Sequence, residues 1–160
     1  MNIFEYAMEF EKDSENYYRD LLKITQDQGL KKILSMLAEE EVKHYNHLKK
    51  LAENADTELP DTQILINSVN IFTEIRKSKK YDLKGTQVDL YRKAKEFELK
   101  SKNYYLAKKE ETNDQKLKAI LQNLANQEDR HYILLDNIIQ FVTRPEQWLE
   151  DAEFNQMTNY

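Results

Sequence analysis

The chain repeats one arrangement of acids and histidines, and this repeat constrains the fold more than any other feature. Glu11 precedes a Glu-x-x-His motif at residues 41–44, and 87 positions later Glu98 precedes the same motif at residues 128–131. An internal repeat indicates that one structural unit is used twice. We therefore expect two half-sites of identical chemistry that meet at a shared centre.

The repeat extends well beyond these residues. When residues 7–48 are placed on residues 94–135 without a gap, 21 of the 42 positions are identical. Apolar and functional positions in both copies recur at alternating steps of three and four, which is the spacing of one helical stripe. Each copy is thus predicted to be a helical hairpin, with the first at about 2–54 and the second at about 85–142.

The turn of the first hairpin is predicted at Gln26 to Gly29. Asp27 can cap the following helix, and Gly29 is available for a left-handed backbone conformation. The segment 55–84 is too long for a hairpin turn and contains a further apolar stretch, 64–75. Such a connection can carry the chain from one end of a bundle to the other, as in bundles with one long crossover.

The composition favours one all-α domain covering residues 1–160. The chain has only two Gly and two Pro among 160 residues, and it is rich in Ala, Leu, Glu, Lys and Gln, which are good helix formers. This length is typical of a single domain. We predict a ferritin-like four-helix bundle built from the two hairpins, followed by a short C-terminal helix at about 145–155.

Composition also excludes several classes of site. The absence of Cys rules out disulfides, thiolate zinc sites and iron-sulfur centres with four cysteines. A net charge of −5 argues against a nucleic-acid partner, because such proteins usually present a basic face. From the sequence we expect neither a signal peptide nor a membrane span, and we expect a cytoplasmic protein.

The charged residues of the repeat lie within leucine-rich helical stripes, and this position predicts their role. Burying an ionised carboxylate in an apolar core costs on the order of several kcal/mol of folding free energy, unless the carboxylate is paired with another charge or coordinated to a metal. In two antiparallel helices, residues equidistant from the turn lie at the same height along the bundle. The midpoint between Glu11 and Glu41 is residue 26, and that between Glu98 and Glu128 is residue 113. Both midpoints lie within predicted turns, the second of which is at Thr112 to Asp114. The four acids are thus expected at one height, as a dinuclear metal site in a four-helix bundle requires. The predicted ligands are Glu11, Glu41, His44, Glu98, Glu128 and His131.

Oxygen and imidazole ligands suit iron, manganese or zinc, because no soft sulfur ligand is present. Iron is our first choice and manganese the second. Tyr18 and Tyr105 lie two turns from the acids on the same stripes, where they can either donate hydrogen bonds to bound carboxylates or act as half-buried packing residues. His47 has Leu134 as its counterpart, so it is not expected to be a ligand.

The sequence resembles the rubrerythrin-type ferritin-like proteins, without a rubredoxin domain, over nearly its whole length. The resemblance lies in residues 11–18, residues 37–44 and their duplicates. It implies that the six predicted ligands bind two irons, with Glu41 and Glu128 bridging them. Rubrerythrins carry a further glutamate where this chain has Ser101. Since no cysteine is available for a rubredoxin iron, the resemblance also implies a separate electron-donor protein.

The leading functional hypothesis is a non-haem di-iron oxidoreductase, a homodimer that reduces hydrogen peroxide to water and takes hydrogen peroxide or dioxygen as its oxidant. One alternative is ferrous-iron oxidation and storage, as in bacterioferritins; these bind haem through a methionine where this chain has Val42, so no haem is expected. Another alternative is a di-manganese catalase. An alternative of a different class is a non-enzymatic stress or interaction module with an empty site.

Overall fold

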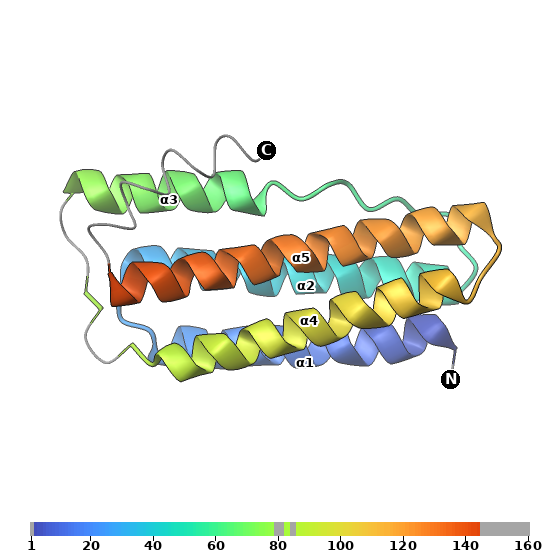
Figure 1. Ribbon diagram of the computed structural model, residues 1–160, viewed down its shortest axis with the longest axis horizontal. Helices are drawn as coiled ribbons and strands as arrows, with labels where there is room; N and C mark the ends of the chain where they lie inside the picture. Colours follow the sequence, from blue (N-terminus) through green and yellow to red (C-terminus); the bar gives the residue numbers. More distant parts are fainter. Residues whose placement is uncertain (1, 79–81, 84–85, 145–160) are drawn as a thin grey trace.

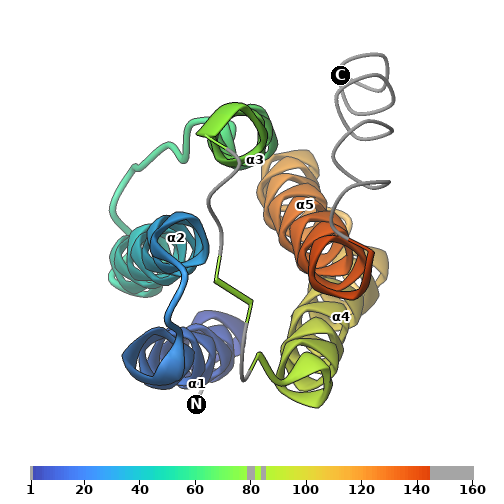
Figure 2. The same ribbon diagram turned by 90° about the vertical axis from the view of Figure 1, so that its left-hand side faces the viewer.

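The computed structural model describes residues 2–78, 82–83 and 86–144. These residues form five α-helices and no strand, which confirms the predicted all-α, ferritin-like bundle. The helices are α1 (Ile3–Ile24), α2 (Gln28–Ala52), α3 (Ile64–Ser78), α4 (Val88–Glu110) and α5 (Gln115–Thr143). Helices α1, α2, α4 and α5 form the bundle, and α3 packs against α2 and α5 (Figures 1 and 2). The predicted C-terminal helix at 145–155 lies outside the described residues.

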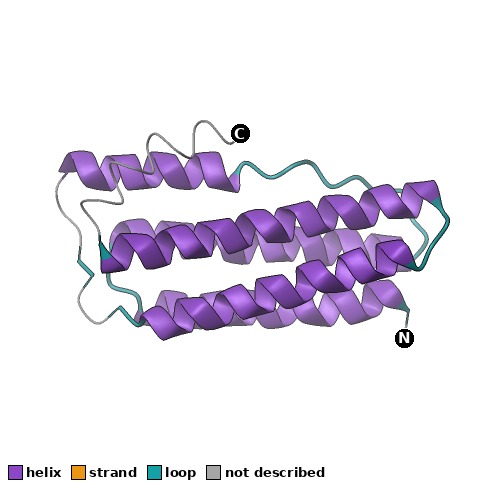
Figure 3. Ribbon diagram, viewed as in Figure 1, coloured by secondary structure: helices purple, strands orange, loops and turns teal. Residues whose placement is uncertain are grey.

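The two hairpins are α1 with α2 and α4 with α5, and their connections are short (Figure 3). Aspartates begin the second helix of each hairpin: Asp27 accepts a hydrogen bond from the backbone N–H of Leu30 at 3.0 Å, and Asp114 accepts one from Lys116 at 3.0 Å. Capping of this kind satisfies N–H groups that have no partner inside the helix. The two caps place the turns where the repeat predicts them.

The backbone conformation of Gly29 differs from the prediction. The residue lies inside the first turn of α2 and has no left-handed backbone conformation. A Cβ atom at this position would be 2.3 Å from Cδ1 of Ile75. The glycine is therefore explained by the close approach of α3, a contact between segments that are far apart in the sequence.

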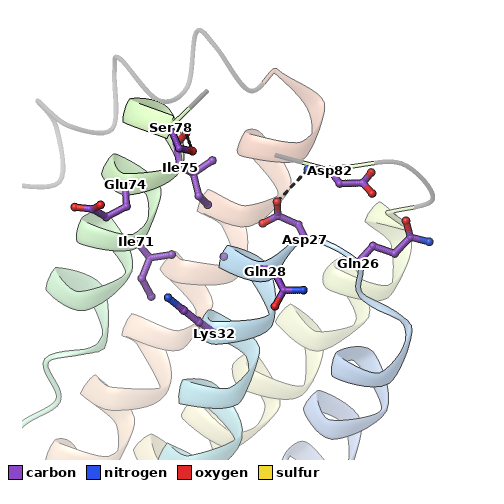
Figure 4. Close-up of a pocket in the computed structure, with 10 residues that line it drawn as sticks. Gln26, Asp27, Gln28, Lys32, Ile71, Glu74, Ile75, Ser78 and Asp82 are labelled. Atoms are coloured by element: carbon purple, nitrogen blue, oxygen red, sulfur yellow. Dashed lines mark hydrogen bonds between the residues drawn. The ribbon is translucent and has the colours of Figure 1, made fainter. Parts of the chain in front are cut away.

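The crossover between the hairpins contains α3, so α2 and α4 run in the same direction (Figure 1). Near the end of α3, Asp27 also accepts a hydrogen bond from the backbone N–H of Asp82 at 3.0 Å (Figure 4). A pocket of about 620 Å³ opens here between the α1–α2 turn, α3 and Asp82. It lies at one end of the bundle and none of the predicted metal ligands lines it.

The core of the bundle is made largely of leucines from α2 and α5. Leu34, Leu37 and Leu48 of α2 are fully buried, as are Leu124 and Leu135 of α5. Leu34, Leu37 and Leu135 belong to one apolar cluster, and Leu48 and Leu124 belong to a second one. Among the described helices, none is both long and apolar enough to cross a membrane.

Candidate metal centre

Six acidic and imidazole side chains converge in the middle of the bundle, and all six have 0% exposure. Glu11 comes from α1 and Glu98 from α4, whereas α2 and α5 each supply a glutamate and a histidine one turn apart. The structure thus brings together the whole predicted set: Glu11, Glu41, His44, Glu98, Glu128 and His131.

The six side chains form two overlapping groups that are each suited to one ion. In each group, four ligand atoms lie within 4.8 Å of one another. Glu11 and His44 belong to one group, Glu98 and His131 to the other, and both groups include Glu41 and Glu128. Two shared carboxylates between two terminal pairs are the arrangement of a dinuclear carboxylate centre.

The distances between neighbouring ligand atoms fit a shared ion. Nδ1 of His44 is 2.8 Å from Oε1 of Glu128 and 3.3 Å from Oε2 of Glu11. Nδ1 of His131 is 2.9 Å from Oε1 of Glu41 and 3.5 Å from Oε1 of Glu98. Ligand atoms bound at about 2.1 Å to one ion are separated by about 3.0 Å in octahedral and about 3.4 Å in tetrahedral geometry. The measured separations span this range.

Several of these atoms have no hydrogen-bond partner within the described structure. They include both carboxylate oxygens of Glu41 and of Glu128, together with Nδ1 of His131. His131 Nδ1 is close to Glu41 Oε1, but the pair lacks hydrogen-bond geometry. Buried polar atoms without partners cost about 1 to 3 kcal/mol each, and more when charged. A pair of divalent cations would satisfy them, so the residues fit the metals that the donor set favours.

The protonation of the metal-free centre follows from burial and from its neighbours. Burial and the charges of Glu11 and Glu98 raise the pKa of Glu41 well above its usual value, and burial and the same two charges do so for Glu128. Burial alone would raise the pKa of Glu11, but the charge of His44, the carboxyl group of Glu41 and hydrogen bonds with His44 and Tyr105 lower it to about 2. The two shared carboxyls therefore hold protons more tightly than Glu11 does.

The pKa values of the two histidines are raised, which is the opposite of what burial alone would cause. Burial lowers the pKa of His131, but the charge of Glu98 and the close carboxylates of Glu40 and Glu41 raise it well above its usual value. The pKa of His44 is raised as well, because Glu11 outweighs the effect of burial. Both imidazoles thus carry an additional proton in the metal-free centre over a wider pH range than a free histidine.

The family comparison agrees with this geometry. The chain matches the rubrerythrin family over residues 2–139. The chain belongs to the rubrerythrin family. No curated protein and no solved structure matches it significantly.

In this member of the rubrerythrin family, each hairpin holds the terminal glutamate of the other through a tyrosine. The hydroxyl of Tyr18 in α1 donates a hydrogen bond to Oε1 of Glu98 in α4. The hydroxyl of Tyr105 in α4 donates to Oε1 of Glu11 in α1 at 2.6 Å. Both tyrosines are buried, with exposed fractions of 1% and 0%. Each can orient one terminal carboxylate towards the centre.

Two further residues contact the histidines from the other side, and our sequence analysis missed them. Nε2 of His44 lies 2.8 Å from Oε1 of Gln127, and Nε2 of His131 lies 3.3 Å from Oε1 of Glu40. Position 40 is the counterpart of position 127 in the repeat, and each immediately precedes a glutamate that both groups share. That offset was the available signal, but it is hidden because one copy has an acid and the other an amide.

The remaining predicted positions lie outside the ligand set. His47 is buried near Thr57, with Nδ1 3.4 Å from Oγ1. Ser101 is buried one turn after Glu98 on the same helix. The hydroxymethyl group of Ser101 cannot replace a carboxylate ligand, so Ser101 adds no further ligand to the six candidates.

Proposed function

We propose that this rubrerythrin-family protein is a cytoplasmic non-haem di-iron oxidoreductase that reduces hydrogen peroxide to water. The balanced reaction takes one peroxide, two electrons and two protons to two waters. The electrons would come from a separate donor protein, since the chain has no cysteine for a rubredoxin-type iron. The acting form would be a homodimer.

The observation that carries the proposal is the pair of four-ligand groups that share Glu41 and Glu128. Four carboxylates and two imidazoles are a donor set that suits iron or manganese. When bound, two irons would supply the two electrons for peroxide and act as Lewis acids towards its oxygens.

The protein's own contribution is to hold the ligands and to exclude water. Tyr18 and Tyr105 fix the terminal carboxylates by hydrogen bonds. Fully buried leucines, among them Leu37 and Leu124, line the bundle core. Preorganised ligands in a dry cavity need little rearrangement when charge develops during the reaction.

Peroxide turnover by the iron-loaded protein tests the proposal. With a chemical or rubredoxin-like donor, we expect peroxide-dependent oxidation of two electron equivalents per peroxide, faster than with the same amount of free iron. A variant with E41Q and E128Q, which alters both shared ligands, should lose this activity. Turnover no faster than free iron would contradict the proposal.

The same measurements separate the alternatives. A di-manganese catalase would release dioxygen from peroxide without any donor. A storage protein of the bacterioferritin kind would form a shell of many subunits, which the mass in solution distinguishes from a dimer. A non-enzymatic module would retain less than one metal ion per chain after gentle purification.

A further inference from the structure

The two histidines at the centre differ in the residue that contacts their outer nitrogen. Gln127 contacts Nε2 of His44, whereas Glu40 contacts Nε2 of His131. The inner contacts are matched between the halves, since each histidine faces one terminal and one shared glutamate. The tyrosine contacts are matched as well. Among the residue types that contact the histidines and the terminal glutamates in these pairs, the difference between the halves lies at positions 40 and 127.

The hydrogen bonds of Gln127 settle which way its amide points. Its Nε2 donates to the backbone carbonyl of Pro60 at 3.0 Å and to Oδ1 of Asn123 at 3.2 Å. A carbonyl oxygen can only accept, so Oε1 of Gln127 must face His44. When His44 is neutral, as a metal ligand must be, its hydrogen is therefore on Nε2 and its Nδ1 is free to bind an ion.

Glu40 holds His131 in the same tautomer but with a charged group. Its carboxylate accepts a hydrogen bond from the hydroxyl of Thr62 and lies 3.7 Å from Nζ of Lys43. An ionised carboxylate can only accept, so Nε2 of His131 is the donor to it. The contact is longer than that of Gln127, at 3.3 Å against 2.8 Å, but hydrogen bonds with an ionised partner are roughly twice as strong as neutral ones.

The crossover fixes both contacts. Pro60 orients Gln127, and Thr62, two residues later, orients Glu40 while its Oγ1 also accepts from the N–H of Ile64 at the start of α3. One short segment outside the duplicated hairpins therefore contacts the two halves differently. The repeat is symmetric in its ligands but not in the groups that support them.

We propose that Glu40 makes the metal position at His131 bind a divalent cation more tightly than the position at His44, so that the two ions load in sequence. This inference rests on the metal centre of the proposed function. A carboxylate that accepts the outer N–H of a ligating histidine increases the basicity of the ligand, and loss of such a partner typically lowers metal affinity by about 10- to 100-fold. An amide at the same place increases the basicity less, because it carries no charge.

Calorimetric titration of the metal-free protein with Co²⁺ tests the inference without reference to activity. The wild type should bind two ions in two resolved steps whose affinities differ about tenfold or more. E40Q should weaken the tighter step by about tenfold, because Oε1 of the new amide can still face His131 but without the charge. E39Q is the matched control, since Glu39 is exposed on the same helix, and its titration should equal that of the wild type.

Shared bridging carboxylates can separate two binding steps by themselves, so the variants decide the outcome. An unchanged ratio of affinities in E40Q, or equal affinities in the wild type, would overturn the inference while leaving the two-metal centre intact. Binding of fewer than two ions by the wild type would overturn the centre itself, and this inference with it.

Discussion

Tyr105 donates a hydrogen bond from its hydroxyl to Oε1 of Glu11 across 2.6 Å, although the two residues are 94 positions apart. Tyr18 makes the equivalent bond to Glu98 in the opposite direction. The two bonds join α1 to α4, the helices that supply only one predicted ligand each. The hairpins are therefore connected to each other at the ligands themselves.

Removal of one of these hydroxyls should destabilise the metal-free fold. We expect Y105F to lower the free energy of unfolding by about 1 to 3 kcal/mol, because a buried carboxylate loses a donor. Tyr6 on α1 is 49% exposed, so Y6F should change stability by less than about 0.5 kcal/mol. Denaturant unfolding of both variants measures the difference, and equal stabilities would show that the hydroxyl of Tyr105 contributes nothing.

Shared and terminal glutamates should differ in the number of ions that depend on them. E41Q alters a ligand common to both four-atom groups, so we expect both ions to bind at least about tenfold more weakly. E98Q alters a ligand of one group only, and about one ion per chain should remain tightly bound. Metal analysis after equilibrium dialysis compares the two variants. The same loss in both would contradict the bridging role of Glu41.

Metal binding should release protons. The raised pKa values of Glu41, Glu128, His44 and His131 place protons on groups that must lose them to become ligands. Up to four protons per chain, about two for each divalent ion, should therefore appear in solution near neutral pH. Calorimetry in buffers of different ionisation enthalpy counts these protons, and a count of zero would show that the metal-free centre is already deprotonated.

The same shifts predict how stability depends on pH in the metal-free protein. The folded pKa of His131 lies above its unfolded value, so its stabilising contribution is complete below about pH 6.5 and is lost as the pH rises through the folded pKa. The raised pKa values of Glu41 and Glu128 act in the same direction, because the fold binds more protons than the unfolded chain. The pKa of Glu11, lowered to about 2, affects stability only in acid, where protonation of Glu11 destabilises the fold.

Thermal unfolding between about pH 6 and about pH 9, from roughly one unit below neutrality to roughly two units above it, measures this effect. The midpoint of the metal-free protein should fall as the pH rises, whereas that of the metal-loaded protein should change little, because its ligands are already deprotonated. A metal-free midpoint that rises with pH would contradict the assigned protonation states.

Gly29 should tolerate a side chain only if the side chain of Ile75 in α3 moves. G29A adds a Cβ 2.3 Å from Cδ1 of Ile75, and we expect a loss of about 1 to 3 kcal/mol from overpacking, despite the better helix propensity of alanine. I75V removes Cδ1, so the double variant should be more stable than the sum of the single effects predicts. Additive effects in the double-mutant cycle would show that the contact is not the cause.

The sequence alone determined the helical hairpins, their turns and the six residues at the centre. Helical periodicity is local, so the stripe through Glu41 and His44 can be read from the chain. The positions of Glu11 and Glu98 along the bundle, level with Glu41 and Glu128, follow from the geometry of a hairpin. Asp27 can be predicted as a helix cap because a capping hydrogen bond spans only three residues. Because the hairpin is duplicated, each of these patterns occurs twice in the sequence.

Only the tertiary structure decided which distant groups support the ligands. The pairing of Tyr105 with Glu11, the contact of Glu40 with His131 and the approach of Ile75 to Gly29 all join segments from different helices. Such contacts depend on how the helices pack and on the path of the crossover, and neither is a periodic property of the chain. For that reason the repeat predicted a symmetric set of ligands, and the packing supplied the asymmetry around it.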